Sequence, residues 1–403
     1  MGDRERDEAM GANAPGRAIQ QSLPAIGGEP DLVSGILPAQ LIKAAIERGD
    51  IRAENRIEDA QIQPASLDLR LGAVAYRVPA SFLPGPVMTV ERKLADLTLE
   101  KIALDGPDGA VLERGHVYLV PLQEGLRLRS RWSGSANPKS STGRLDVFAR
   151  VITDYSGEFD SIAERYCGPL WLEIAPRSFH VRVRQGSRLA QVRLRYGRPR
   201  TSDSFIRDLN ERARLVHAGE EAAGAGNPAD IKQGAIALSV DLATAGADDI
   251  VGYRAKRADQ AVDVDRVGAY DPAEFWEPVA KPAGGAIVLE TDDFYILASK
   301  ERVSIPQDYA ADMVAYDTLV GEFRVHYAGF FDPGFGYEGD KPVGAKIVLE
   351  VRSHEVPFLI DHGQIMGRVL FERLSQPTDR PYGQGIGSNY QGQALALSKQ
   401  FKR

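Results

Sequence analysis

A short segment near residue 140 concentrates side chains that bind anions. It reads Pro138-Lys139-Ser140-Ser141-Thr142-Gly143-Arg144 and combines two cations, three hydroxyls and a glycine. Arginine can donate paired hydrogen bonds to phosphate oxygens, lysine adds a point charge, and hydroxyl and backbone N–H groups complete the cradle. The segment predicts a phosphate-binding loop, although an ordinary solvated loop can have the same composition.

A second segment combines a turn with a carboxylate in an apolar strand. Residues 331–336 read Phe-Asp-Pro-Gly-Phe-Gly, and the strand-like run 347–351 carries Glu350 between Leu349 and Val351. If Glu350 faces inward, burial raises the pKa of its carboxyl toward the range in which it exchanges protons. The pattern predicts either a general base or a solvent-facing glutamate of a half-buried strand.

The elements that must position these residues are mainly β-strands. From residue 62 onward the chain consists of short apolar or alternating runs broken by Gly and Pro, such as 67–71, 117–120 and 181–183. A short helix is expected over 38–46, because Pro38 suits a first helical position and Gly49 suits the exit. The fold class is predicted as mainly β with a few short helices.

Similar short sequence motifs recur along the chain at a fixed interval, which indicates two related units. Leu170-Trp171-Leu172-Glu173-Ile174 recurs 177 residues later as Ile347-Val348-Leu349-Glu350-Val351, and Gly186 recurs as Gly363. Ser66-Leu67-Asp68-Leu69 is matched with Ser239-Val240-Asp241-Leu242 at an interval of 173. We predict a mobile tail (1–34), a first unit with the phosphate loop (35–200), a helical and flexible linker (201–230) and a second unit with Glu350 and a C-terminal tail (231–403).

Composition restricts the class of protein. The 403 residues are 43% hydrophobic and 26% charged, with a net charge of -7 that argues against a large surface for duplex nucleic acid. The single cysteine, Cys167, excludes an intrachain disulfide framework and a multi-cysteine zinc site. The sequence shows neither a membrane-spanning run nor an export signal, so we expect a cytoplasmic protein with no membrane partner.

Several motifs follow one another along the chain: residues 63–71, the Ser140-Ser141 loop ending in Arg144, Asp332-Pro333-Gly334-Phe335, Val348-Leu349-Glu350, Arg380-Pro381-Tyr382 and residues 389–393. Taken in this order, they resemble the motifs of the dCTP deaminase family, which belongs to the dUTPase superfamily. The family is known for distorted β-barrel or jelly-roll units, trimeric assembly with sites between subunits, and Mg²⁺ carried by the nucleotide triphosphate. The resemblance implies two tandem units of this fold and covers nearly all of the chain beyond the N-terminal tail.

The resemblance also implies a role for each matched residue. Glu350 would be the catalytic glutamate that takes a proton from water, and Asp332 would bind the deoxyribose hydroxyl. The matched phosphate loop includes a serine that would help to hold the attacking water, and the C-terminal tail would close over the nucleotide. Asn389 stands where the family has lysine, and Lys139 where it has arginine. The other expected site residues are Ser140 and Arg144 as catalytic groups and Lys139, Ser141, Val348, Leu349, Tyr382 and Gln393 as substrate-binding groups.

The two units differ in which site motifs they retain. At the interval of 177, Tyr316, Asp317, Thr318 and Gly321 stand opposite Lys139, Ser140, Ser141 and Arg144, so the second unit has lost the phosphate cradle. The first unit keeps Glu173 but has no Asp-Pro-Gly-Phe turn. We therefore predict that the first unit supplies the phosphate loop and the second supplies the catalytic glutamate and the tail, in a homo-oligomer with sites shared between units.

The predicted function is hydrolytic deamination of dCTP to dUTP and ammonia, without zinc and with Mg²⁺ on the triphosphate. Zinc-dependent cytidine deaminases need a Pro-Cys-x-x-Cys pair, which this sequence lacks. One alternative is a dUTP diphosphatase or a bifunctional enzyme, because the same cradle can serve attack at phosphorus. Another is a nucleotide-binding regulator without catalysis.

Overall fold

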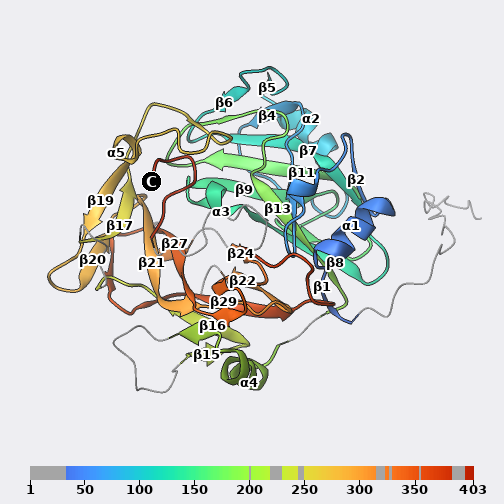
Figure 1. Ribbon diagram of the computed structural model, residues 1–403. Helices are drawn as coiled ribbons and strands as arrows, with labels where there is room; N and C mark the ends of the chain where they lie inside the picture. The colour runs from blue at the N-terminus through green and yellow to red at the C-terminus, as the bar shows by residue number, and fades with distance from the viewer. Residues whose placement is uncertain are drawn as a thin grey trace, which may run out of the picture. The chain divides into compact units, whose positions relative to one another are not determined.

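The computed structural model describes residues 33–198, 201–217, 229–243, 249–314, 323–325, 329–353, 355–383 and 395–403. In these residues strands far outnumber helices, so the predicted mainly β fold with a few short helices is confirmed (Figure 1). The helices are α1 (Ala39–Glu47), η1 (Asp59–Gln61), α2 (Val90–Leu97), α3 (Ser140–Gly143), α4 (Asp203–Ala213) and α5 (Pro272–Phe275).

The first half of the chain forms two antiparallel sheets and contributes to a third. One sheet contains β1 (Gly35–Ile36), β3 (Leu67–Leu69), β8 (Trp132–Pro138), β10 (Ser161–Ile162) and β13 (Ala190–Tyr196). Another contains β2 (Ile51–Ala53), β4 (Val74–Val78), β5 (Glu100–Ala103), β7 (Val117–Arg127), β9 (Val147–Thr153) and β11 (Cys167–Pro176). The third joins β6 (Ala110–Leu112) and β12 (Val181–Val183) to β18 (Val262–Asp263) of the second half.

The second half also forms two main sheets. One contains β14 (Val216–His217), β17 (Ile250–Ala255), β19 (Trp276–Ala280), β21 (Phe294–Val303), β23 (Phe323–Val325) and β27 (Ala345–Ser353). The other contains β15 (Ile231–Lys232), β16 (Ala235–Ser239), β22 (Tyr309–Val314), β24 (Phe330–Phe331) and β29 (Ile365–Arg373). Two small two-stranded sheets pair β20 (Ala286–Leu289) with β28 (Phe358–Asp361) and β25 (Tyr337–Glu338) with β26 (Lys341–Pro342).

Strand pairings in the two halves recur at the interval found in the sequence. Leu119 of β7 pairs with Glu173 of β11, and Ile296 of β21 pairs with Glu350 of β27, so both partners are displaced by 177 residues. The pairing of β8 with β13 recurs in the same way as that of β22 with β29. Glu173 and Glu350 therefore occupy corresponding positions in corresponding strands.

One predicted correspondence is wrong. Gly186 N donates to Leu71 O at 2.8 Å and Gly363 N donates to Val240 O at 2.9 Å, so Leu71 corresponds to Val240 at an interval of 169 residues. The match of residues 66–69 with 239–242 at an interval of 173 is therefore displaced by four residues. Short strand-like sequence motifs can resemble each other by chance, whereas backbone hydrogen bonds define which strand positions of the two halves correspond.

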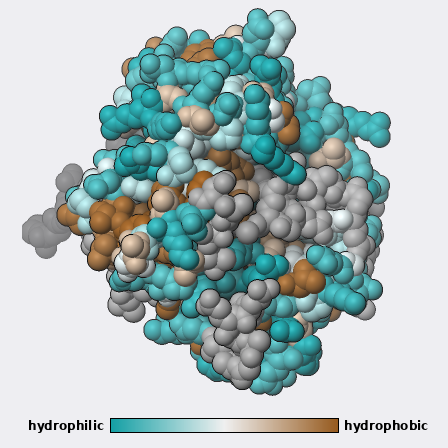
Figure 2. All heavy atoms as spheres, turned by 60° about the vertical axis from the view of Figure 1, so that its left-hand side comes forward, coloured by the Kyte–Doolittle hydropathy of each residue, from teal (hydrophilic) through white to brown (hydrophobic). Residues whose placement is uncertain are grey.

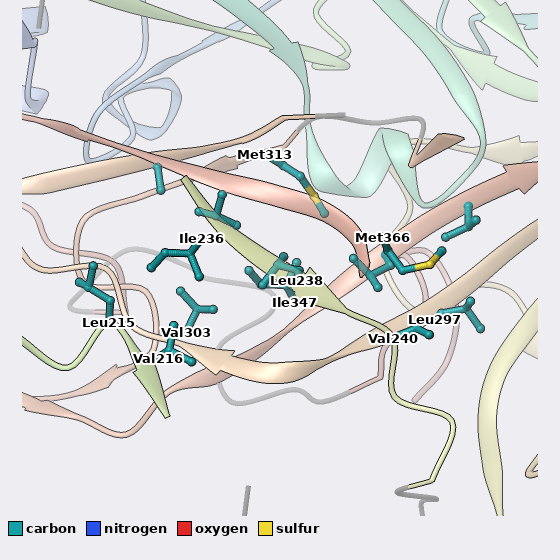
Figure 3. Close-up of a cluster of buried hydrophobic side chains, with 14 of the residues drawn as sticks. Leu215, Val216, Ile236, Leu238, Val240, Leu297, Val303, Met313, Ile347 and Met366 are labelled. Atoms are coloured by element: carbon teal, nitrogen blue, oxygen red, sulfur yellow. The ribbon is translucent and has the colours of Figure 1, made fainter. Parts of the chain in front are cut away.

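The start of the chain and the predicted linker can be described in part. The predicted tail lies, up to residue 32, outside the described residues, as does the Ala/Gly run 222–228. Helix α4 is present where the apolar spacing predicts one, and its Ile206 and Leu209 are buried in the second half's core. Leu215, which follows the helix, belongs to the same core (Figure 3). Pro38 is the N-cap of α1 rather than its first helical residue.

The alternation of β27 decides which residues face the second half's core. Ile347, Leu349 and Val351 are packed in that core, so Val348 and Glu350 lie on the opposite face of the strand. Figure 2 shows one face of the molecule, on which hydrophilic residues predominate and hydrophobic residues gather in separate patches. Within the described residues, no helix has the length and apolar character needed to cross a bilayer.

Candidate active site

The predicted phosphate loop forms α3 and its flanks, directly after β8. Lys139 is the N-cap, its carbonyl accepts from Thr142 N at 2.7 Å, and Thr142 Oγ1 donates to Leu189 O at 2.8 Å. Ser141, Thr142 and Arg144 are buried. These contacts fix the conformation of the loop that carries Ser140, Ser141 and Arg144.

Lys139 has an acidic neighbour within the first half. Its Nζ lies 2.5 Å from Oδ2 of Asp68, which is on β3 and almost fully buried. The other carboxylate oxygen of Asp68, Oδ1, is buried and has no hydrogen-bond partner in the described part of the chain. Part of the Lys139 charge is therefore already balanced by the protein.

The predicted Asp-Pro-Gly-Phe turn follows β24 and contacts the C-terminal tail. Gly334 has a φ of +92°, a conformation that favours glycine, and its N donates to Ile305 O at 2.9 Å. Tyr382 N donates to Pro333 O at 2.7 Å, and the rings of Phe335 and Tyr382 lie 5.9 Å apart. The turn that carries Asp332 therefore packs against Tyr382.

Arg193 of the first half reaches the turn of the second half. It is fully buried on β13, forms an ion pair with Asp312, and its Nη2 lies 3.4 Å from Oδ1 of Asp332. Burial raises the pKa of Asp332 to about 6, while the positive charges of Arg193 and Lys139 lower it and the negative charge of Asp68 raises it. Asp332 and the Lys139–Asp68 pair thus lie within electrostatic range of each other.

Glu350 is buried beside the phosphate loop. Its side chain projects from the non-core face of β27, and the residue is 6% exposed. Burial raises the pKa of Glu350 to about 8, and the nearby Arg144 lowers it while Asp146 raises it. Among the described residues no lysine or arginine forms an ion pair with Glu350, so burial dominates its electrostatics.

A second ion pair joins the same two elements. Arg352 lies two residues after Glu350 on β27 and forms an ion pair with Asp146, which follows α3. Ser178 Oγ donates to the same carboxylate of Asp146 at 2.6 Å. This link between the halves holds the strand that carries Glu350 against the segment that carries Arg144, and Figure 1 draws α3 next to β27.

The corresponding glutamate of the first half is in a different environment. Glu173 is fully buried, and Arg150 donates to its Oε1 from Nε at 3.0 Å and from Nη2 at 2.5 Å. Arg150 also donates to Ser81 Oγ at 3.1 Å and lies over the ring of Phe159. On the same face of β11, Trp171 packs with α2 and the segment before it, so this face is covered by the chain's own residues.

The fold brings most of the predicted site residues into one region of the molecule, although they are far apart along the chain. Arg144 and Glu350 are electrostatic neighbours, as are Lys139 and Asp332, and Ser140 and Ser141 lie on α3 between Lys139 and Arg144. Val348 is partly exposed on the same face of β27 as Glu350, whereas the side chain of Leu349 is buried in the core and cannot contact a ligand. Gln393 and Asn389 lie outside the described residues.

Sequence reasoning missed the residues that join the two halves. The sequence did contain a signal for Arg352, because its spacing of two from Glu350 places both on one strand face. Arg193 and Asp146 carry no comparable local signal, since their partners Asp332 and Arg352 are more than a hundred residues away. In the described part of the chain, no group of three or more His, Cys, Asp or Glu side chains could hold a metal ion.

Both halves of the chain match models of known protein domains. Residues 33–198 match the N-terminal domain model of 2'-deoxycytidine 5'-triphosphate deaminase, and residues 202–401 match the C-terminal domain model of the same family. The chain belongs to the dCTP deaminase family. The resemblance seen in the motifs is thereby confirmed.

Solved and curated members of the dCTP deaminase family agree with this assignment. The crystal structure of 2'-deoxycytidine 5'-triphosphate deaminase from Agrobacterium tumefaciens is 49% identical, with a TM-score of 0.79 over 85% of this chain and 99% of that chain. The dUMP-forming dCTP deaminase of Beutenbergia cavernae is 31% identical over 36% of this chain and 74% of its own length. The dCTP deaminase of Haloarcula marismortui is 35% identical over 30% of this chain and 60% of its own length.

Proposed function

We propose that this protein hydrolyses the exocyclic amine of dCTP, giving dUTP and ammonia. The observation that carries the proposal is the environment of Glu350, a buried carboxylate with a raised pKa beside Arg144 of the phosphate loop. A carboxyl group with a pKa of about 8 can accept a proton from water and return it near neutral pH. The names of the related proteins, dCTP deaminase and dUMP-forming dCTP deaminase, supply the substrate class.

In the proposed reaction Glu350 acts as the general base. It takes one proton from a water molecule while the water oxygen bonds to C4 of cytosine. Of the two protons of the water, one is passed through Glu350 to ring N3 and the other to the amino nitrogen. The C4–N bond then breaks, ammonia leaves and the uracil ring remains with a carbonyl at C4. Ser140 is proposed to help hold the attacking water, because it lies on the loop whose Arg144 neighbours Glu350.

The phosphate loop is proposed to bind the triphosphate. Ser141 and Arg144 would donate hydrogen bonds to phosphate oxygens, and Lys139 would add a charge that it shares with Asp68. Mg²⁺ is proposed to arrive with the nucleotide, where its preferred oxygen ligands are phosphate groups and water. It would neutralise part of the triphosphate charge that the loop does not balance.

The remaining predicted residues are proposed to bind the nucleoside. Asp332 would accept a hydrogen bond from the deoxyribose hydroxyl, and Val348 would line the same strand face as Glu350. Tyr382 is proposed to help cover the nucleotide, because it packs on the turn that carries Asp332. Gln393 is proposed to act in the C-terminal tail. Leu349 could contact the nucleotide only through its main chain, because its side chain is buried in the core.

The contacts between the halves support the proposed division of labour. The first half supplies the loop with Ser140, Ser141 and Arg144, and the second supplies Asp332 and Glu350. The ion pairs of Arg193 with Asp332 and of Arg352 with Asp146 hold these parts together within a single chain. Assembly into a homo-oligomer and a cytoplasmic location stay predictions.

A second candidate is a bifunctional enzyme that continues to dUMP. It is favoured by the names of several relatives, including the Beutenbergia cavernae protein and that of Halobacterium salinarum, which are both called dUMP-forming dCTP deaminases. The same phosphate cradle would then position a water molecule for attack at phosphorus. The two candidates differ only in whether pyrophosphate is released.

The test is incubation of the purified chain with dCTP and Mg²⁺, followed by chromatography of nucleotides and assays of ammonia and pyrophosphate. Stoichiometric dUTP and ammonia support the deaminase, whereas dUMP with equal pyrophosphate supports the bifunctional form. Arg144→Ala is expected to lower kcat/KM by about 100-fold, because a charge-assisted hydrogen bond to phosphate and a cation beside Glu350 are lost. Calorimetric binding of dCTP without product would instead identify a regulator and refute the proposal.

A further inference from the structure

The end of the chain passes over the phosphate loop. Ser398 Oγ donates to Ser141 O at 2.6 Å, and Arg144 Nη1 donates to Ala396 O at 3.0 Å. Both contacts join the C-terminal segment 395–403 to the loop of the first half. Residues between Ser398 and the chain end are therefore positioned beside the proposed triphosphate site.

The segment is anchored on both sides of Lys399. Gly268 N donates to Lys399 O at 2.9 Å, and Gln400 Nε2 donates to Val264 O at 2.6 Å. The ring of Phe401 lies 5.4 Å from that of Phe275 and also contacts the rings of Tyr270, Trp276 and Phe179. Figure 1 accordingly marks the C-terminus beside α5. These anchors fix the backbone from which the Lys399 side chain projects.

The charges around Lys399 belong to the same loop region. Burial and the positive charge of Lys139 lower the pKa of Lys399, and Arg188 acts in the same direction. Asp265 and Asp68 raise it, but Asp265 also pairs with Arg184, and Asp68 also pairs with Lys139. Lys399 and Lys139 therefore lie within electrostatic range of each other beside the phosphate loop.

We propose that Lys399 is a phosphate-binding residue, which reaches the triphosphate of the nucleotide from the C-terminal segment and acts together with Lys139 and Arg144. This proposal rests on the proposed function and extends it to a residue outside the predicted motifs. Lys139 shares its charge with Asp68, so a further cation beside the loop would help to balance a triphosphate. The negative charge of a triphosphate would attract both lysines.

The test compares Lys399→Met, Lys399→Arg and Lys402→Met. Methionine keeps an unbranched apolar stem but removes the charge, and arginine keeps the charge. Lys402 is the matched control, because it is exposed and lies three residues further along the same segment. Binding of inorganic triphosphate is measured by calorimetry, and the kinetics of dCTP are compared with those of deoxycytidine, which has no phosphate.

We expect Lys399→Met to weaken triphosphate binding and to raise KM for dCTP by about 10- to 100-fold, as for the loss of one charge-assisted hydrogen bond. The value of kcat and the kinetics of deoxycytidine should change little, and Lys399→Arg should restore most of the affinity. Lys402→Met should match the wild type.

Triphosphate binding by Lys399→Met that equals the wild type would overturn the proposal, as would equal losses for dCTP and deoxycytidine. If Lys399→Met fails to fold, failure of Lys399→Arg to bind triphosphate in a folded state would overturn it. A wild type that binds triphosphate through Lys399 but releases no ammonia from dCTP would instead refute the proposed function and leave this assignment intact.

Discussion

Glu173 and Glu350 hold corresponding positions in the two halves but have different surroundings. Each pairs with a corresponding residue of the neighbouring strand, Leu119 or Ile296, and each is almost fully buried. Glu173 is neutralised by Arg150, whereas in the described part of the chain Glu350 has only Arg144 as a more distant cation. Glu173 is therefore bound to a structural partner, whereas burial raises the pKa of Glu350 to about 8, where a carboxyl group can exchange a proton.

The two strand faces also differ in what covers them. The face of Glu173 is covered by Trp171, α2 and the segment before α2, all from the same half. The face of Glu350 meets α3 of the other half through Arg144, Asp146 and Arg352. The same strand position thus serves packing in one half and borders the proposed substrate site in the other.

The strongest test of this comparison is to neutralise each glutamate separately. Glu350→Gln is expected to lower kcat for dCTP by about 1,000-fold or more, because general base catalysis contributes roughly 10²- to 10⁴-fold. Glu173→Gln is the matched control and should keep activity within about threefold, since no substrate is proposed to reach it. Ammonia release measures both, and circular dichroism checks folding. Robust turnover by Glu350→Gln would end the proposed assignment.

The pH dependence of activity should report on Glu350. Glu350 must be deprotonated to act as a base, and its pKa is about 8. The value of kcat/KM should therefore rise about tenfold per pH unit below pH 8 and level off above it. Arg144 lowers the pKa of Glu350. Arg144→Lys keeps the cation and should keep the pH range in which kcat/KM rises (the acidic limb), whereas Arg144→Ala should move this limb to higher pH. A limb that is unchanged in Arg144→Ala would contradict the assignment of the limb to Glu350.

The buried charge of Glu350 should also cost stability at high pH. Its pKa is about 8 in the folded protein against an ordinary pKa of 4.5, so the native state loses stability as pH rises from about 4.5 to 8. Glutamine cannot ionise, and Glu350→Gln should therefore be more stable than the wild type by on the order of a few kcal/mol at pH 9. The difference should shrink toward pH 5. Thermal unfolding at both pH values measures it, and an equal difference at both would contradict the raised pKa.

The smallest expected effect concerns the ion pair of the first half. Arg150→Ala removes the partner of fully buried Glu173 and should lower the free energy of unfolding by about 1–3 kcal/mol. The double variant Arg150→Ala, Glu173→Gln should recover part of this loss, because no unpaired charge remains buried. Denaturant titration measures both. Activity per folded molecule should remain near that of the wild type, and a selective loss of activity would place Glu173 in a working site.

The sequence by itself determined the kind of elements and the chemistry of the main motifs. Short alternating runs dictate strands, because side chains of a strand project alternately to its two faces. The loop from Lys139 to Arg144 and the apolar strand with Glu350 are short sequence motifs that can be recognised without knowledge of the fold. The interval of 177 between corresponding residues was also readable, because strand patterns retain spacing.

Only the tertiary structure decided which of these residues meet. Alternation alone cannot say which face of a strand is buried, so the inward side chain of Leu349 and the opposite face of Glu350 depend on how the sheet packs. Arg193 with Asp332, Arg352 with Asp146 and Ser398 with Ser141 are pairs separated by more than a hundred residues. Local sequence carries no signal for such contacts, because they arise where sheets from the two halves pack together. The correspondence between the strands of the two halves is also decided by the tertiary structure. Backbone hydrogen bonds show that Leu71 corresponds to Val240, although residues 66–69 resemble residues 239–242 at a different interval.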